Sequence, residues 1–136
     1  MKYDTKEPCK SCPYRMDAPL GLWHPSEFQN LARTERDQFG AVFGCHATRH
    51  RRTPSVCAGW LIQQRDAGVP SIALRLEMLR APDAADALRT VSDGGHSLYD
   101  SVEAMIEANE TLGRCYECER YLSADGQCPE HGEDAL

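Results

Sequence analysis

Seven cysteines in a 136-residue chain, four within residues 9–57 and three within residues 115–128, constrain its fold more than any other feature. An odd number of thiols cannot pair completely into disulfides. The N-terminal residues have no apolar stretch typical of a secretory signal, and no run reaches the roughly 20 apolar residues of a membrane helix. We therefore expect a cytoplasmic protein, where clustered cysteines more often bind metal or carry redox chemistry than form bridges.

The composition predicts a thin hydrophobic core and an uneven charge. Apolar residues make up 41% of the chain and aromatic residues only 7%, so bound metal would have to supply part of the folding free energy. The net charge of −6 hides a first half, residues 1–60, with nine Lys/Arg against six Asp/Glu. Such an acidic chain is not expected to bind DNA broadly and non-specifically.

Hydrophobic periodicity and capping residues predict a mainly α-helical fold with irregular, metal-pinned loops. The expected helices are Pro25–Arg36, Cys57–Ala67, Ile72–Arg80 after the N-cap Ser71, Asp83–Val91, and a longer stretch from Leu98 to Gly113 after the N-cap Ser97. In the last of these, Leu98, Val102, Met105 and Ile106 form a stripe that would pack as core, against another helix, or in a homodimer.

The C-terminal segment carries the stronger metal signal. Cys115 and Cys118 form one CxxC pair, and Cys128 and His131 form a CxxH pair nine residues later. Four such ligands are what a tetrahedral zinc ion takes, and a short segment with few apolar residues would not fold without one. We predict two domains, a helical domain over residues 1–113 and a small zinc ribbon or knuckle over residues 114–136.

The remaining cysteines form a second set of four. Cys9 and Cys12 belong to a CxxC motif, whereas Cys45 and Cys57 stand alone, and His46 or His24 could replace one thiolate. A closed four-cysteine zinc site would use this set without further chemistry. A [4Fe–4S] cluster also takes four cysteines, often with a proline after one of them, as Pro13 follows Cys12. A redox-active thiol site is the third reading.

Four ordered motifs carry a resemblance to a known group of proteins: PCxxCPYR from Pro8, GxW from Gly21, GCH from Gly44 and CAGWL from Cys57. Together with Ile72-Ala73-Leu74-Arg75-Leu76 they resemble an uncharacterised family of small cysteine-motif proteins from bacteria and their phages. The likeness covers about residues 7–80. It implies that the four N-terminal cysteines share one site with His46 alongside, and it supplies no activity.

One further feature points to a partner. Arg49, Arg51 and Arg52 form the densest positive charge, and arginine forks match phosphate oxygens, so a nucleic-acid contact is predicted here beside the plainer reading of a solvated loop. No glycine-rich phosphate loop, GxSxG or HExxH motif is present, so an enzyme with an open zinc site is the weakest reading. The leading hypothesis is a small zinc-binding module with a regulatory role, acting through a protein or nucleic-acid partner. The alternative is an iron–sulfur or redox-sensing protein.

Overall fold

The computed structural model describes residues 1–36, 42–123 and 125–130, and their arrangement is mainly helical. Five α-helices follow in order: α1 Pro25–Arg36, α2 Ala58–Asp66, α3 Ile72–Arg80, α4 Pro82–Thr90 and α5 Val102–Glu110. A 3₁₀ turn spans His46–Thr48. Within the described residues the extended backbone forms isolated β-bridges rather than a sheet. The predicted helical class is therefore confirmed.

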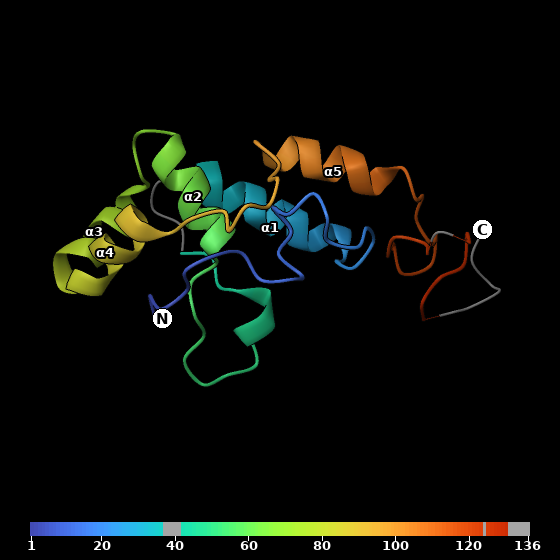
Figure 1. Cartoon of the computed structure of the whole chain (residues 1–136). Coiled ribbons are helices and arrows are strands. Elements are labelled where there is room, and N and C mark those ends of the chain that lie inside the picture. The colour runs from blue at the N-terminus through green and yellow to red at the C-terminus, as the bar shows by residue number, and fades with distance from the viewer. Residues whose placement is uncertain (37–41, 124, 131–136) are drawn as a thin grey trace.

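The helices are arranged as three packed pairs along the length of the molecule. Helix α3 packs against α4, α4 against α2, and α1 against α5, so that the helices lie in a row with α3 and α4 at one end and the C-terminal segment at the other (Figure 1). The loop between His46 and Val56 projects from the side of this row. The core runs through all the pairs, and its largest buried side chains include Tyr14, Leu31, Trp60, Leu61, Leu74, Met105 and Tyr121.

Helix α2 is the centre of the fold. Its first five residues are all buried, and Trp60 and Leu61 are fully inaccessible. Polar groups join it to the next helix: the buried Gln64 side chain accepts a hydrogen bond from the Ser71 amide at 2.7 Å. The Ser71 hydroxyl in turn accepts from the Leu74 amide at 3.2 Å, the N-cap that the sequence predicts.

The predicted start of the last helix is wrong by four residues. Helix α5 begins at Val102, and Ser101 rather than Ser97 caps it by accepting from the Ala104 amide at 3.1 Å. The backbone around Leu98 is instead paired with the N-terminal loop, in an antiparallel bridge to Arg15. Because those amides and carbonyls already bond to another segment, they cannot enter a helix.

The apolar stripe on α5 packs into the core of its own chain. Val102 and Met105 are fully buried, and Leu98 and Ile106 lie partly buried against the same cluster. The homodimer reading stays a prediction. No helix among the residues described is long and apolar enough to cross a membrane.

The C-terminal segment lies against the helical part. Tyr121 belongs to the main core and meets Phe28 of α1 edge to face, with ring centroids 6.1 Å apart. The amide of Leu122 donates to the Gly113 carbonyl at 3.0 Å, at the position where the sequence predicts a domain boundary. The division at residue 113 stays a prediction.

Candidate metal centres

The first candidate centre is formed by three cysteines of the C-terminal segment. The sulfur atoms of Cys115, Cys118 and Cys128 all lie within 4.8 Å of one another, and those of Cys118 and Cys128 are 3.7 Å apart. Cys115 and Cys128 are buried, whereas Cys118 is half-buried. This cluster could hold a metal ion. His131, the predicted fourth ligand, lies outside the described residues.

A tight turn aims these thiols at one point. The amide of Glu119 donates to the Cys115 carbonyl at 2.8 Å, and the Cys115 amide donates to the Arg120 carbonyl at 2.8 Å. Glu119 takes the left-handed conformation with φ of 63°, which reverses the chain after the CxxC pair. The hydrogen bond from the Arg120 amide to the Cys118 sulfur lowers the pKa of Cys118, but burial and the neighbouring thiols of Cys128 and Cys115 raise it above its ordinary value overall, so a bound metal would displace that proton.

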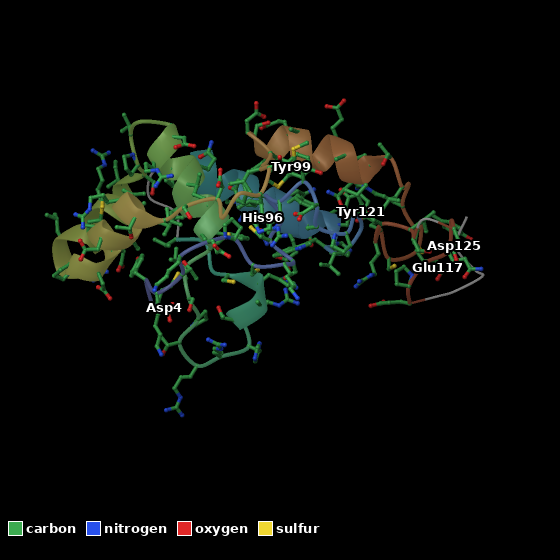
Figure 2. All side chains as sticks on the ribbon, in the orientation of Figure 1. Asp4, His96, Tyr99, Glu117, Tyr121 and Asp125 are labelled. Atoms are coloured by element: carbon green, nitrogen blue, oxygen red, sulfur yellow. The ribbon has the colours of Figure 1, made fainter. Side chains whose placement is uncertain are left out.

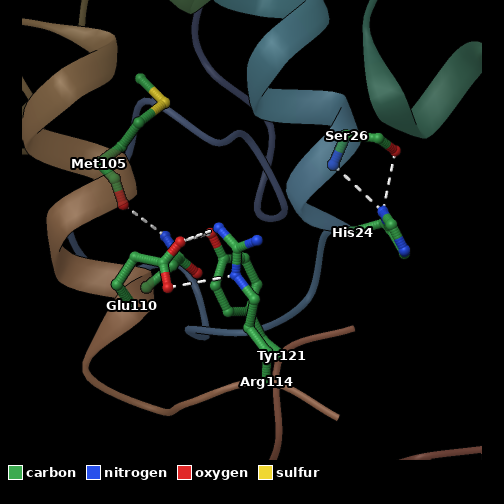
Figure 3. A network of polar contacts seen from close by, with 7 residues as sticks. His24, Ser26, Met105, Glu110, Arg114 and Tyr121 are labelled. Atoms are coloured by element: carbon green, nitrogen blue, oxygen red, sulfur yellow. Dashed lines mark hydrogen bonds and ion pairs between the residues drawn. The ribbon is translucent and has the colours of Figure 1, made fainter. Parts of the chain in front are cut away.

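His24 ties this centre to the start of α1. The Ser26 amide donates to the His24 Nδ1 at 3.1 Å, which places the lone pair there and the proton on Nε2 (Figure 3). Nε2 is 2.8 Å from the Cys118 carbonyl oxygen and donates to it. Both ring nitrogens are thus engaged, so His24 supports the C-terminal cysteine turn in this structure. Orienting contacts of this kind are typical around metal ligands.

A second set of contacts fixes the segment that leads into Cys115. Arg114 forms an ion pair with Glu110 of α5, and its guanidinium lies 5.6 Å from the centre of the Tyr121 ring (Figure 3). The Tyr121 hydroxyl donates to the same Glu110 carboxylate at 3.3 Å. The cysteine cluster is therefore held on the end of α5 as well as on α1.

The second candidate centre holds the four N-terminal cysteines as two pairs, and no three of their sulfur atoms lie within 4.8 Å of one another. The sulfur atoms of Cys9 and Cys45 are 3.8 Å apart, and those of Cys12 and Cys57 are 4.0 Å apart. The Cys12 amide donates to the Cys9 carbonyl at 3.0 Å, so a turn connects the two pairs. The partners are 36 and 45 residues apart in the sequence and come from different elements. That all four ligate one ion stays a prediction.

In each pair the contact lowers the pKa of one cysteine and raises the pKa of the other. A hydrogen bond from the Cys45 thiol lowers the pKa of Cys9 to about 5, and the same contact raises the pKa of Cys45. The hydrogen bond from Cys57 likewise lowers the pKa of Cys12, while that contact and burial raise the pKa of Cys57. A bound cation would take the place of the two shared protons.

Backbone amides also converge on these sulfur atoms. Cys9 accepts from the Ser11 amide, Cys12 from the Tyr14 amide and Cys45 from the Ala47 amide, each two residues ahead. Cys57 accepts from the Trp60 amide in the first turn of α2. Such N–H···S bonds favour the negatively charged sulfur, so the local backbone of every knuckle is arranged for thiolates.

Large side chains close the second centre. A Cβ atom added to Gly59 would lie 2.9 Å from the Cys12 sulfur and 2.7 Å from the Tyr14 ring, so only glycine fits beside this thiol. Trp23 donates from Nε1 to the Ser11 carbonyl at 3.1 Å, and its ring centre is 3.9 Å from that of His46. His46 Nδ1 is buried without a hydrogen-bond partner. As an alternative ligand it stays a prediction.

The remaining predicted contact residues lie on the projecting loop. Arg49, Arg51 and Arg52 are all exposed, and Arg49 approaches Glu27 at 3.5 Å. Sequence reasoning missed the role of His24 at the C-terminal cysteines, because its partner is a backbone carbonyl 94 residues away. It also missed Gly59, whose need for a missing Cβ depends on the position of Tyr14.

The comparison with known families decides the identity of the chain. A family model matches residues 4–116, which include the four N-terminal cysteines, all five helices and Cys115. The chain belongs to DUF6283, a family of unknown function. The expected resemblance to an uncharacterised family is confirmed at this level, and a bacterial or phage origin stays a prediction. No curated protein and no solved structure matches the chain.

Proposed function

We propose that this member of DUF6283 is a zinc-binding module that holds two structural zinc ions and displays its loops to a partner in the cytoplasm. Cys9, Cys12, Cys45 and Cys57 would hold one ion. The cluster of Cys115, Cys118 and Cys128 would hold the other, with His131 as the fourth ligand. Each ion would supply folding free energy and fix the loops, a structural role in which the metal takes no part in a reaction.

The spacing of the sulfur atoms carries this proposal. A tetrahedral zinc ion with Zn–S bonds of about 2.3 Å separates its sulfur ligands by about 3.8 Å. The separations are 3.7 Å between Cys118 and Cys128, 3.8 Å between Cys9 and Cys45, and 4.0 Å between Cys12 and Cys57. A [4Fe–4S] cluster spreads its four cysteines over four iron atoms and needs wider separations. At the C-terminal centre the geometry therefore favours a single ion. At the N-terminal centre only the separations within the two pairs match zinc, since no three of the four sulfur atoms lie within 4.8 Å of one another, and zinc is proposed there from the four-cysteine donor set.

Metal analysis of anaerobically purified protein tests the proposal. We expect a colourless protein with about two zinc ions per chain. Because all seven cysteines belong to the two centres, each centre is the control for the other: Cys45→Ser and Cys118→Ser should each lower the zinc content to about one ion. Cobalt(II) added in place of zinc should give the absorption of tetrahedral cobalt thiolates at both centres.

Two results would overturn the proposal. A brown protein that contains iron would establish the iron–sulfur alternative at the N-terminal centre. A metal-free protein in which Cys9 links to Cys45 and Cys12 to Cys57 on mild oxidation would establish a redox dithiol instead, since each pair would lose two protons and two electrons to the added oxidant. Mass spectrometry of alkylated peptides distinguishes this product from zinc-bound thiolates.

A further inference from the structure

The segment around the projecting loop is free of acidic residues in a chain that is otherwise rich in them. The sequence has 21 Asp and Glu, yet none lies between Asp37 and Asp66. The same interval contains Arg49, Arg51 and Arg52. The loop is therefore a locally positive surface on a protein whose net charge is −6.

The loop is held in shape by hydrogen bonds at its base. The Cys45 amide donates to the Ser55 carbonyl at 2.7 Å, and the Ser55 amide donates to the buried Thr48 hydroxyl at 2.9 Å. The Arg51 amide donates to the Thr48 carbonyl at 2.9 Å. These bonds close the base of the loop, and we call residues 49–53 its tip. Because the backbone of the loop is already held in place, binding a partner costs little backbone conformational entropy.

The tip presents its charges to solvent, and only Arg49 has a carboxylate close by, that of Glu27 at 3.5 Å. Residues 49–53 are all exposed, and side chains with nitrogen ends extend outward from this loop (Figure 2). In the described part of the chain no carboxylate pairs with Arg51 or Arg52. Several other arginines have a carboxylate partner, as Arg80 has in Glu77 and Arg89 in Asp86.

The N-terminal residues add a further cation at the base of the loop. The Lys2 amide donates to the Pro54 carbonyl at 2.9 Å, and the Val56 amide donates to the Lys2 carbonyl at 2.8 Å. Lys2 is exposed beside the stem. The N-terminal segment therefore lies beside the base of the loop (Figure 1), and it brings both the cation Lys2 and the exposed anion Asp4, labelled in Figure 2, to that side of the molecule.

We propose that the tip of this loop binds the phosphate backbone of a nucleic acid through Arg49, Arg51 and Arg52. The planar guanidinium matches phosphate oxygens with two parallel hydrogen bonds. The tip, Arg-His-Arg-Arg-Thr, has no aliphatic or aromatic anchor, whereas protein interfaces draw most of their affinity from such anchors. A row of phosphates therefore fits this surface better than an acidic protein. This proposal names a partner class for the proposed zinc-binding module. It rests on that module only at one point, because the metal centre at Cys45 and Cys57 would fix the two ends of the loop.

Salt-dependent binding measures the number of phosphates engaged. Fluorescence anisotropy of a labelled 20-base-pair DNA duplex, the same sequence as a single strand, and a matching RNA strand would be followed between 50 and 200 mM salt. Three neutralised phosphates give a slope of log K against log salt of about −2.7 on duplex DNA and about −2.1 on single strands. The affinities for the three probes at one salt concentration tell which form of nucleic acid is preferred.

A charge-matched pair of variants separates the loop from overall charge. Arg51→Glu with Arg52→Glu should weaken binding by about tenfold or more at 50 mM salt and reduce the slope by about two contacts. Arg75→Glu with Arg89→Glu makes the same change of net charge on α3 and α4 and should leave affinity within about twofold. Zinc content is measured on each variant, so that a loop effect is not confused with loss of metal.

Three outcomes would contradict the proposal: no binding of any nucleic acid by the wild-type protein at 50 mM salt, an equal loss in both variants, or retention of a polyglutamate peptide in preference to DNA and RNA. The last would assign the loop to an acidic protein. A protein that carries no zinc yet binds nucleic acid through this loop would refute the proposed function and leave this inference standing. The two can therefore fail separately.

Discussion

Replacing Gly59 by alanine is the sharpest test of the packing around the N-terminal centre, because two physical effects predict opposite signs. Gly59 is the second residue of α2, and in a helix alanine is favoured over glycine by up to about 1 kcal/mol. The added methyl group, however, would lie 2.7 Å and 2.8 Å from atoms of Tyr14 and 2.9 Å from the Cys12 sulfur. Both neighbours are almost completely buried and cannot move aside freely.

The contacts decide the sign. Extra atoms in a well-packed core cost about 1–3 kcal/mol, and three contacts below 3.0 Å place this substitution at the upper end. After the gain in helix propensity, we expect Gly59→Ala to lower the free energy of unfolding by about 1–2 kcal/mol and the Tm by about 4–8 °C. We also expect the N-terminal centre to lose its metal before the C-terminal centre, since the Cys12 sulfur is displaced.

Gly44→Ala is the matched control. Gly44 has no positive φ, and an added Cβ would meet its nearest atom, the end of the flexible Met1 side chain, at 3.4 Å. Urea denaturation of the metal-loaded proteins gives the two free energies, and a chelator titration gives the order of metal release. If Gly59→Ala were as stable as the wild type or more so, the reasoning from close packing at Cys12 would be refuted.

Three further predictions concern single contacts. Ser71→Ala and Ser101→Ala should each lower the free energy of unfolding, measured in urea, by about 1 kcal/mol, because their hydroxyls cap α3 and α5. Ser97→Ala should change it little, and equal effects at all three positions would contradict the capping assignment. Burial and the nearby Glu77 carboxylate raise the pKa of Tyr3 to about 12 from the ordinary 10.0. Its contribution to stability is therefore complete below pH 10 and is lost as the pH rises from 10 to 12, and Tyr3→Phe should remove this loss. A tyrosine absorbance titration in which every phenol ionises near pH 10 would refute the prediction. His24→Ala should weaken zinc binding at the C-terminal centre by about tenfold or more in a chelator competition, and His50→Ala, on the exposed loop, should not; identical retention in both would show that the Cys118 contact does not support the metal.

The sequence predicts four of the five helices to within a residue or two because their signals are local. Pro25 begins α1, and Ser71 caps α3 as expected. The start of α5 could not be obtained in this way, because Ser97 and Ser101 are equally good caps by sequence. The bridge between Leu98 and Arg15 decides between them, and it joins residues 83 positions apart. Tertiary pairing overrides a local preference here.

The two cysteine centres differ in the same respect. Cys115, Cys118 and Cys128 lie within 14 residues, so their spacing alone predicts that they meet, and they do. For the N-terminal set the sequence predicts which four cysteines belong to the site but not which of them pair with each other. The pairing of Cys9 with Cys45 and of Cys12 with Cys57 depends on how the stem of the projecting loop and the start of α2 are placed. Long-range contacts of this kind leave no periodic trace in a sequence.

Helix length explains why such a chain would need its cysteines. Four of the five helices have nine residues and the other has 12, and isolated helices shorter than about 12–15 residues are marginal in water. Without a sheet in the described residues, the long loops have few backbone partners to hold them. Several cysteines stand close to helix ends: Cys57 directly precedes α2, Cys45 directly precedes the 3₁₀ turn, and Cys115 follows the end of α5 by five residues. Closing those junctions fixes the loops, and with them the charged tip that lies between Cys45 and Cys57.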